Sequence, residues 1–210
     1  ADLSEADAII VNTCGFIESA KTEAIENILE ACSYKQQNPE LKVIVTGCLA
    51  ERYRSQIEEE IPEVDAVVGC ASNKAIDTIV ARLFHGEDHL ESYGAKKDFP
   101  LGGKRVIGTP AHYAYLKIAE GCNNRCHYCA IPGIRGPLHS RDMADCVAEA
   151  RWLAGEGVKE LIVVAQDPTA YGEDWGKPGS ICELLDKLNK VPGLEWIRIM
   201  YAYPERITDE

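Results

Sequence analysis

The sequence lacks a long apolar run and lacks a surplus of basic residues. No stretch reaches the roughly 18 consecutive apolar residues that a membrane-spanning helix needs, so we expect no membrane partner. Lys and Arg together number 22 against 34 Asp and Glu, and the formal net charge is −12. Broad, non-specific binding to nucleic acid depends on a cationic surface. The charge balance therefore argues against RNA as a direct substrate and suits a basic protein partner.

The nine cysteines cannot all pair off into disulfides, because nine is an odd number. No apolar leader precedes the first strand, so we expect no secretion signal. Hydrophobic residues make up 46% of the 210 residues, which is enough for an ordinary core without disulfide cross-links. We therefore expect metal binding in the reducing cytoplasm rather than a disulfide framework.

The first 86 residues predict an amino-terminal α/β domain. Short apolar runs alternate there with stretches of helical periodicity. The expected strands are residues 8–11, 42–46 and 64–68, and the expected helices are residues 19–35, 51–60 and 73–84. This βαβαβα order predicts a doubly wound parallel sheet.

A polar stretch separates this domain from a second alternation. Residues 87–112 are rich in Gly, Lys and Pro and are expected to form a linker. Residues 113–210 form the expected second domain, with strands at 115–119, 160–165 and 196–200 and helices at 142–156 and 180–189. Three parallel strands and two helices make a poor closed unit, and the first domain enters its first strand almost at once. We therefore expect the native protein to continue on both sides.

Cysteines and polar residues follow the expected strands in both halves. Cys14, Cys48 and Cys70 follow the three strands of the first domain. In the second domain a cysteine-rich loop follows the first strand, and Gln166-Asp167 follows the second. Ligand sites in parallel α/β domains lie at the carboxyl ends of the strands. We therefore expect function at this edge of each sheet.

The cysteine-rich loop carries Cys122, Cys126 and Cys129 in the spacing C-x3-C-x2-C. Soft thiolates favour zinc, Cu(I) or an iron–sulfur cluster. A structural zinc site would need a fourth ligand, for which His127 and His139 are the nearest candidates. Three thiolates on a cluster of four irons would instead leave one iron open to a ligand. We therefore favour a [4Fe–4S] cluster held by the three cysteines.

This spacing, with Tyr128 before the last cysteine and a strand before the loop, resembles the radical S-adenosylmethionine superfamily. The resemblance implies the first part of a partial (β/α) barrel and a [4Fe–4S] cluster on the three cysteines. It also implies that S-adenosyl-L-methionine chelates the open iron and is cleaved to a 5′-deoxyadenosyl radical, with the protein supplying placement and shielding. Tyr128 stands at the position that lies near the adenine.

Two motifs of the first domain narrow the family. N-T-C-G-F at residues 12–16 and T-G-C-L-A-E-R at 46–52 resemble the amino-terminal domain of the methylthiotransferases. The resemblance implies that Cys14 and Cys48 hold a second, auxiliary [4Fe–4S] cluster, whose first ligand lies upstream of this sequence. The alternative is that both are small buried residues at strand ends. Cys70 does not match a ligand position and is expected to be structural.

Two further motifs bear on the substrate. Q-D-P-T-A-Y-G at 166–172 and Y-A-Y-P at 201–204 resemble the methylthiotransferases that modify a ribosomal protein, whereas relatives that modify transfer RNA carry Gln-Asn at the first of these positions. The resemblance implies an enzyme that adds a methylthio group to the β-carbon of an aspartate in a small-subunit ribosomal protein. It also implies a reducing protein as electron donor and a separate sulfur donor.

Four residues complete the candidate set. Gln166, Asp167 and Arg141 are expected to bind cofactor or substrate, and Arg135 could bind a carboxylate because arginine suits forked contacts. Their structural alternatives are turn and cap chemistry for the first two and surface salt bridges for the arginines.

Two other functions stay open at this stage. One is a transfer-RNA adenosine methylthiotransferase with the same chemistry, and the other is a non-catalytic iron–sulfur protein. The remaining cysteines lie in expected helices and are expected to be core residues: Cys32, Cys146 and Cys182.

Overall fold

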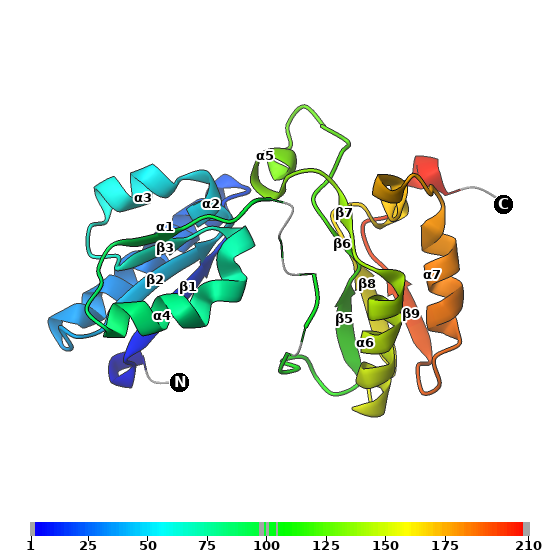
Figure 1. Cartoon of the computed structure of the whole chain (residues 1–210), viewed down its shortest axis with the longest axis horizontal. Coiled ribbons are helices and arrows are strands. Elements are labelled where there is room, and N and C mark those ends of the chain that lie inside the picture. The colour runs from blue at the N-terminus through cyan, green and yellow to red at the C-terminus, as the bar shows by residue number, and fades with distance from the viewer. Residues whose placement is uncertain (1–2, 97–98, 100, 104, 208–210) are drawn as a thin grey trace. The chain divides into compact units, whose positions relative to one another are not determined.

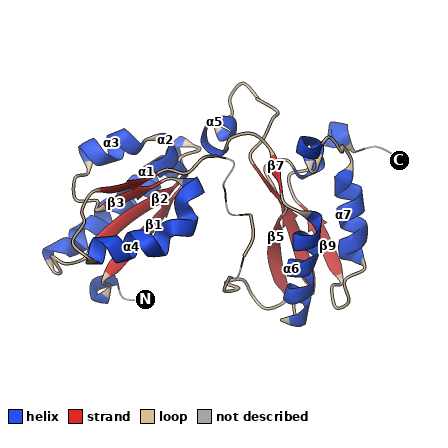
Figure 2. Cartoon of the chain, in the orientation of Figure 1, coloured by secondary structure: helices blue, strands red, loops and turns tan. Residues whose placement is uncertain are grey.

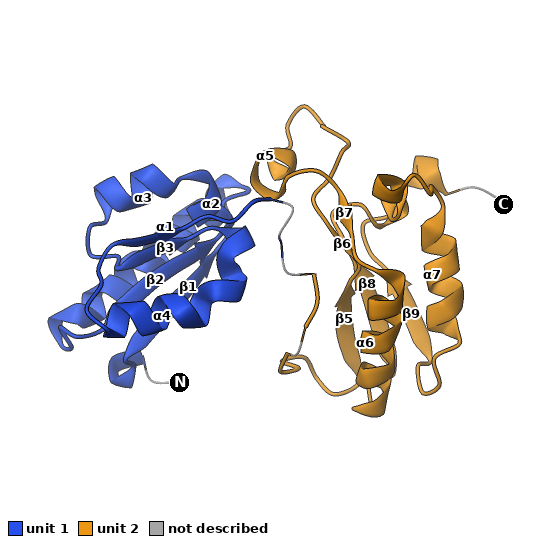
Figure 3. Cartoon of the chain, viewed as in Figure 1, with its two compact units in different colours: residues 1–100 blue, residues 101–210 orange. Residues whose placement is uncertain are grey.

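The computed structural model describes residues 3–96, 99, 101–103 and 105–207. The chain divides into two compact units, Ala1–Pro100 and Leu101–Glu210 (Figure 3). Each unit is built on its own parallel sheet, and its strands alternate with helices along the chain (Figure 2). Both units therefore have the α/β class that the alternation of apolar runs and helical patterns predicted.

The first unit contains a four-stranded parallel sheet in the order β1-β2-β3-β4 (Figure 1). The strands are β1 (Ala8–Thr13), β2 (Lys42–Gly47), β3 (Ala66–Val68) and β4 (Leu90–Ser92). β4 lies inside the stretch 87–112 that the sequence marked as a linker, so that stretch begins by extending the first sheet. Residues 97–98, 100 and 104 of the same stretch lie outside the described residues.

Helices cover both faces of this sheet. α1 (Glu18–Ser33), α2 (Cys48–Arg52) and α3 (Arg54–Glu60) share one apolar cluster with Val43 and Val45 of β2. α4 (Ile76–Phe84) packs in a second cluster with Ile44, which points to the opposite face because side chains alternate along a strand. Short 3₁₀ turns complete the unit at Leu3–Glu5, Tyr34–Gln36 and Cys70–Ala75.

The helix expected at 51–60 is divided in the structure. It begins earlier, at Cys48, and is interrupted at Tyr53, whose backbone (φ −125°, ψ 31°) is not helical. α2 therefore starts directly where β2 ends, so Cys48 stands in the first turn of a helix at the carboxyl edge of the sheet.

The second unit contains a three-stranded parallel sheet in the order β5-β8-β9. The strands are β5 (Tyr113–Lys117), β8 (Glu160–Val164) and β9 (Trp196–Ile199), joined by α6 (Met143–Gly155) and α7 (Ser180–Asn189). A small antiparallel pair, β6 (Ala119–Glu120) with β7 (His139–Ser140), and the short helix α5 (Ile131–Arg135) flank the cysteine loop. Short 3₁₀ turns occur at Pro168–Ala170, Glu173–Trp175 and Pro204–Arg206.

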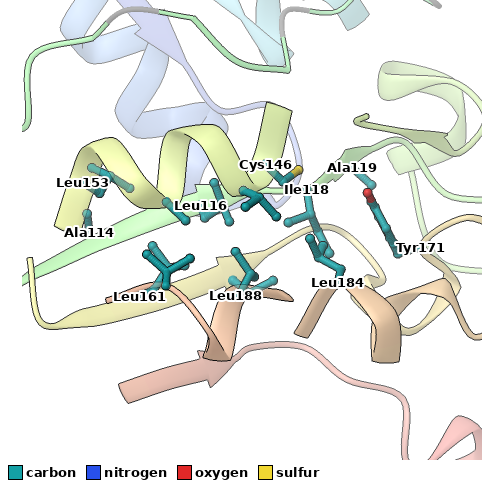
Figure 4. Close-up of a cluster of buried hydrophobic side chains, with 14 of the residues drawn as sticks. Ala114, Leu116, Ile118, Ala119, Cys146, Leu153, Leu161, Tyr171, Leu184 and Leu188 are labelled. Atoms are coloured by element: carbon teal, nitrogen blue, oxygen red, sulfur yellow. The ribbon is translucent and has the colours of Figure 1, made fainter. Parts of the chain in front are cut away.

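The core of the second unit lies between its sheet and the helices α6 and α7 (Figure 4). Leu116 of β5 and Leu161 of β8 meet Leu153 of α6 and Leu188 of α7 there. Cys146 is fully buried in this core, and burial raises the pKa of its thiol to about 12. The expectation that Cys146 is structural agrees with this environment.

The other two helical cysteines differ from Cys146. Cys32 is half-buried, at the margin of the first unit's core, and Cys182 is exposed. The expectation that Cys182 is a core residue is wrong, because the buried stripe of α7 runs through Ser180, Leu184 and Leu188. Within the described part of the chain, no helix is both long and apolar enough to cross a membrane.

Candidate metal centre

The cysteine loop leaves β6 through a glycine whose conformation other residues rarely adopt. Gly121 has φ +74°, and a Cβ at this position would lie 2.1 Å from the carbonyl oxygen of Pro137. The loop can therefore turn only because residue 121 has no side chain. The backbone N–H of Cys122 then donates to the carbonyl oxygen of Gly136 at 3.2 Å, which fixes the first cysteine against the far end of the loop.

The three thiols of the loop are half-buried. Partial burial is the main reason why the pKa of Cys122 is raised, and the neighbouring Asp167, Cys129 and Cys126 raise it further. The backbone N–H of Asn124 opposes this by donating to the Cys122 sulfur at 3.5 Å. Three soft donors on one loop suit an iron–sulfur cluster.

The spacing of these sulfurs also bears on the zinc alternative. Among the described residues, no group of three or more His, Cys, Asp or Glu side chains is arranged to hold a single metal ion. The thiolates of a four-iron cluster bind different irons and need not converge on one point. The choice of a four-iron cluster over a closed zinc site stays a prediction.

Two asparagines brace the loop between its cysteines. The Asn123 side chain accepts the backbone N–H of Leu138 at 3.1 Å. The Asn124 side chain donates to Oδ2 of Asp167 at 2.7 Å and accepts from Arg206 at 3.0 Å. These contacts tie the loop to the segments that follow β8 and β9, so three strand ends together hold the cysteines.

Asp167 is 1% exposed and has both carboxylate oxygens occupied. Oδ1 accepts the backbone N–H of Thr169 at 3.1 Å and caps the turn Pro168–Ala170, while Oδ2 accepts from Asn124. The turn and cap role that the sequence left open is thus present. A direct contact of Asp167 with cofactor stays a prediction.

Gln166 belongs to a second polar group, centred on Glu120. Glu120 is 1% exposed, ends β6, and forms ion pairs with Lys117 and with Arg135, the latter at 3.1 Å. Nε2 of Gln166 donates to Glu120 at 2.7 Å. The side-chain amide oxygen of Gln166, Oε1, is buried without a hydrogen-bond partner among the described residues. A buried acceptor of this kind is costly when unpaired. Binding of a cofactor or substrate by Gln166 stays a prediction.

Arg141 and Tyr128 lie in opposite environments. Arg141 is 7% exposed and pairs with Glu149, so it is a buried ion-pair residue rather than the surface salt bridge of the structural alternative. It also donates to the carbonyl oxygens of Lys117 and Asp145, which leaves its guanidinium engaged within the protein. Tyr128 is 87% exposed, so its ring is open to solvent for a partner.

Cys14 and Cys48 follow the carboxyl ends of two paired strands in the first sheet; Cys14 is exposed and Cys48 is half-buried, so the alternative that both are buried is wrong. In the pairing of β1 with β2, Thr13 lies opposite Gly47. Cys14 directly follows Thr13, and Cys48 directly follows Gly47. The Thr13 hydroxyl donates to the carbonyl oxygen of Thr46 at 2.6 Å and ties the two strand ends together. Gly47 has φ +99°, and a Cβ there would lie 2.2 Å from the Thr13 carbonyl oxygen.

Cys70 is buried against Ala71 and Phe99, and Cys48 packs at the margin of the same group. The Cys70 backbone N–H donates to the Glu51 carboxylate at 3.1 Å. This packing agrees with the structural role expected for Cys70.

The sequence did not single out Glu120, Asn124 or Arg206. Glu120 carried a signal, because it is an acidic residue at the end of an otherwise apolar strand. Asn124 and Arg206 carried none, because their contact joins residues 82 positions apart.

Two family models match different parts of the chain. A family model described as "Uncharacterized protein family UPF0004" matches residues 1–87, and the model of the radical SAM superfamily matches residues 116–209. A solved structure of the radical S-adenosylmethionine methyltransferase TsrM from Kitasatospora setae, with cobalamin and a [4Fe–4S] cluster bound, superposes with a TM-score of 0.57. At 12% identity, over 89% of this chain and 42% of the other, that likeness shows the fold.

Curated relatives are much closer in sequence. A protein named "Ribosomal protein uS12 methylthiotransferase RimO" from Acetivibrio thermocellus is 49% identical over 100% of this chain and 48% of its own length. The protein of the same name from Clostridioides difficile is 48% identical over 100% of this chain and 47% of its own length. The chain spans about half the length of the curated relatives it matches.

The cysteine loop at the strand ends of an α/β sheet, together with the superfamily match, defines a radical SAM protein. The predicted fold class is confirmed: an amino-terminal parallel-sheet domain followed by the first part of a radical-SAM partial barrel. Within that class, the chain belongs to the methylthiotransferase family of the RimO type.

Proposed function

We propose that the protein containing this chain adds a methylthio group to the β-carbon of an aspartate in ribosomal protein uS12. The observation that supports this most is the braced three-cysteine loop at the carboxyl edge of β5 and β8, in a chain close in sequence to proteins named for that activity. The chain's net charge of −12 also suits a basic ribosomal substrate. RNA is not proposed as a direct substrate.

In this proposal Cys122, Cys126 and Cys129 hold a [4Fe–4S] cluster whose open iron takes S-adenosyl-L-methionine. When bound, this pair supplies a 5′-deoxyadenosyl radical able to remove hydrogen from an unactivated carbon. The protein's own residues orient the cofactor and exclude water. Exposed Tyr128 offers its ring to the adenine, and the unpaired amide oxygen of Gln166 can accept a hydrogen bond from a cofactor or substrate donor.

Asp167 and Arg141 are assigned supporting positions in the same site. Asp167 holds Asn124 and thereby the cysteine loop. Arg141 keeps its ion pair with Glu149 and sets the backbone that follows β7, where Tyr171 donates to the Arg141 carbonyl oxygen at 2.7 Å. Their contribution to cofactor binding is then a matter of positioning.

Cys14 and Cys48 are proposed as two ligands of an auxiliary [4Fe–4S] cluster, completed by a cysteine upstream of residue 1. The two residues follow paired strand ends at one edge of the sheet, which supports the proposal. Sulfur from a sulfur donor would reach the substrate at this second cluster, and a reducing protein would supply electrons. We place this activity in the cytoplasm.

The direct test supplies the intact, reconstituted and reduced enzyme with uS12 and, separately, with transfer RNA. The expected result is 5′-deoxyadenosine together with the mass of one methylthio group on uS12. Modification of the transfer RNA instead would favour an adenosine methylthiotransferase. No cleavage of S-adenosyl-L-methionine would favour a non-catalytic iron–sulfur protein and contradict the proposal.

A further inference from the structure

The segment after β9 returns over the cysteine loop and places a tyrosine hydroxyl on one of its sulfurs. The Tyr203 hydroxyl lies 3.8 Å from Sγ of Cys126, within the range of a hydrogen bond to sulfur. Tyr203 is half-buried, whereas Tyr201 two residues earlier is exposed. Among the described residues, Tyr203 forms a hydrogen bond to the cysteine loop and Tyr201 does not.

This contact is held in place by a second one from the same segment. Arg206, in the turn Pro204–Arg206, donates to Asn124 at 3.0 Å and lies 3.9 Å from Oδ2 of Asp167. Asn124 and Cys126 are two residues apart, so the segment after β9 contacts the loop at two neighbouring positions. The position of the Tyr203 hydroxyl is therefore fixed by its neighbours as well as by its own bond.

The direction of the hydrogen bond follows from the chemistry of a ligated cysteine. A cysteine bound to iron is a thiolate and has no hydrogen to donate, so the hydroxyl must be the donor. Reduction adds negative charge that spreads onto the cluster sulfurs. A donor to one of those sulfurs stabilises the reduced state more than the oxidised state, and hydrogen bonds to sulfur are among the factors that set cluster potentials.

We infer that Tyr203 is a positioning residue that raises the reduction potential of the cluster held by the three-cysteine loop, through its hydrogen bond to Cys126. The inference rests on the proposed function only for the presence of that cluster. Tyr203 does not touch the reacting atoms in this assignment. It makes the electron that starts the reaction easier to deliver.

The test uses the intact enzyme reconstituted with iron and sulfide. Redox titration followed by electron paramagnetic resonance measures the midpoint potential of the cluster on the three-cysteine loop. Tyr203→Phe keeps the ring and removes the donor. We expect the ratio of reduced to oxidised cluster at a fixed potential to fall roughly tenfold, which is about 59 mV for a one-electron couple. Tyr201→Phe is the matched control and should leave the potential unchanged.

A second variant tests the sign. A ring-fluorinated tyrosine at position 203 keeps the hydroxyl and makes it a stronger donor, so the potential should rise. Unchanged potentials in both Tyr203 variants, or equal shifts in the Tyr201 control, would overturn the inference. If Tyr203→Phe takes up no cluster, the fluorinated variant decides alone. If the unsubstituted intact enzyme takes up no cluster at this loop, the proposed function fails at this site and the inference fails with it.

Discussion

Each unit carries cysteines at the carboxyl edge of its parallel sheet. The two edges are built alike, but the second edge has three candidate ligands for a cluster and the first has two. In each, a glycine with positive φ precedes a cysteine at a strand end: Gly47 before Cys48 and Gly121 before Cys122. The second edge has three cysteines on one loop, braced by partners from two later strand ends. The first edge has two cysteines, which follow two strand ends joined by one threonine hydrogen bond. Two strand ends can thus position two ligands with few contacts. A set of three ligands on one segment needs a loop long enough to form hydrogen bonds with several neighbouring segments.

The largest effect is expected when the complete edge loses one ligand. Cys126→Ala should abolish cluster uptake at the three-cysteine loop, because the two remaining thiolates cannot anchor a four-iron cluster. Iron and sulfide content after reconstitution measures this. Cys182→Ala is the matched control, because Cys182 is exposed on α7 and should leave the content unchanged. Equal uptake by both variants would show that the loop is not the site.

The glycines test whether the two edges depend on the same backbone device. Gly121→Ala and Gly47→Ala each place a methyl group against a carbonyl oxygen, at 2.1 and 2.2 Å, in a conformation that alanine rarely adopts. We expect each to destabilise its unit by about 1–3 kcal/mol or more. Gly155→Ala is the control, since its Cβ would meet nothing within 4 Å.

The readouts for these variants follow from where the tryptophans lie. All three, Trp152, Trp175 and Trp196, belong to the second unit. Their fluorescence in urea therefore reports Gly121→Ala, while hydrogen exchange of the β1 and β2 amides reports Gly47→Ala. A loss of stability in Gly121→Ala without a loss in Gly47→Ala would show that the two edges do not depend on the same backbone conformation.

The braces should differ in strength between the two edges. Asp167→Ala removes a buried carboxylate that accepts from Asn124 and Thr169, and should cost the second unit about 1.5–3 kcal/mol. Thr13→Val removes one neutral hydrogen bond at the first edge and should cost about 1 kcal/mol. Urea unfolding for the former and hydrogen exchange for the latter measure these changes. The reverse order would contradict the view that the second edge is the more strongly braced.

The smallest effect is expected from the incomplete edge. The double substitution Cys14→Ala with Cys48→Ala should leave the iron content of this chain unchanged, because two ligands hold an auxiliary cluster poorly. The same substitution in the intact enzyme should remove about half of the iron, since one of two clusters would be lost. Electron paramagnetic resonance separates the two clusters. A clear loss of iron already in this chain would mean that the first edge binds metal without an upstream ligand.

Most of the fold could be predicted because it depends on local patterns. The apolar runs of β1, β2, β5 and β8 and the periodic stretches of α1, α6 and α7 are legible within windows of a few residues. β4 was not predicted, because its three residues, Leu90–Ser92, form a strand only through pairing with β3. The pair β6 and β7 was missed for the same reason: its pairing, not its composition, defines it.

The site was predictable where spacing carries the chemistry and hidden where tertiary contacts do. The spacing of Cys122, Cys126 and Cys129 predicts a cluster from residues alone. Asp167 was expected at the site, but the reason it is buried, its bond to Asn124, joins residues 43 positions apart. Arg141 read as a surface residue in its structural alternative, whereas the fold buries it beside Glu149.

The distance along the chain between the cysteine loop and its grip has a consequence for synthesis. Tyr203 lies 77 residues after Cys126, and Arg206 lies 82 residues after Asn124. A ribosome adding about 5–20 residues per second leaves the loop ungripped for several seconds after it is made. During that interval the three thiols belong to an unfinished domain. Iron delivered before β9 is synthesised would meet a loop without its contacts to Tyr203 and Arg206. Iron delivered afterwards would meet a loop in which these contacts can form.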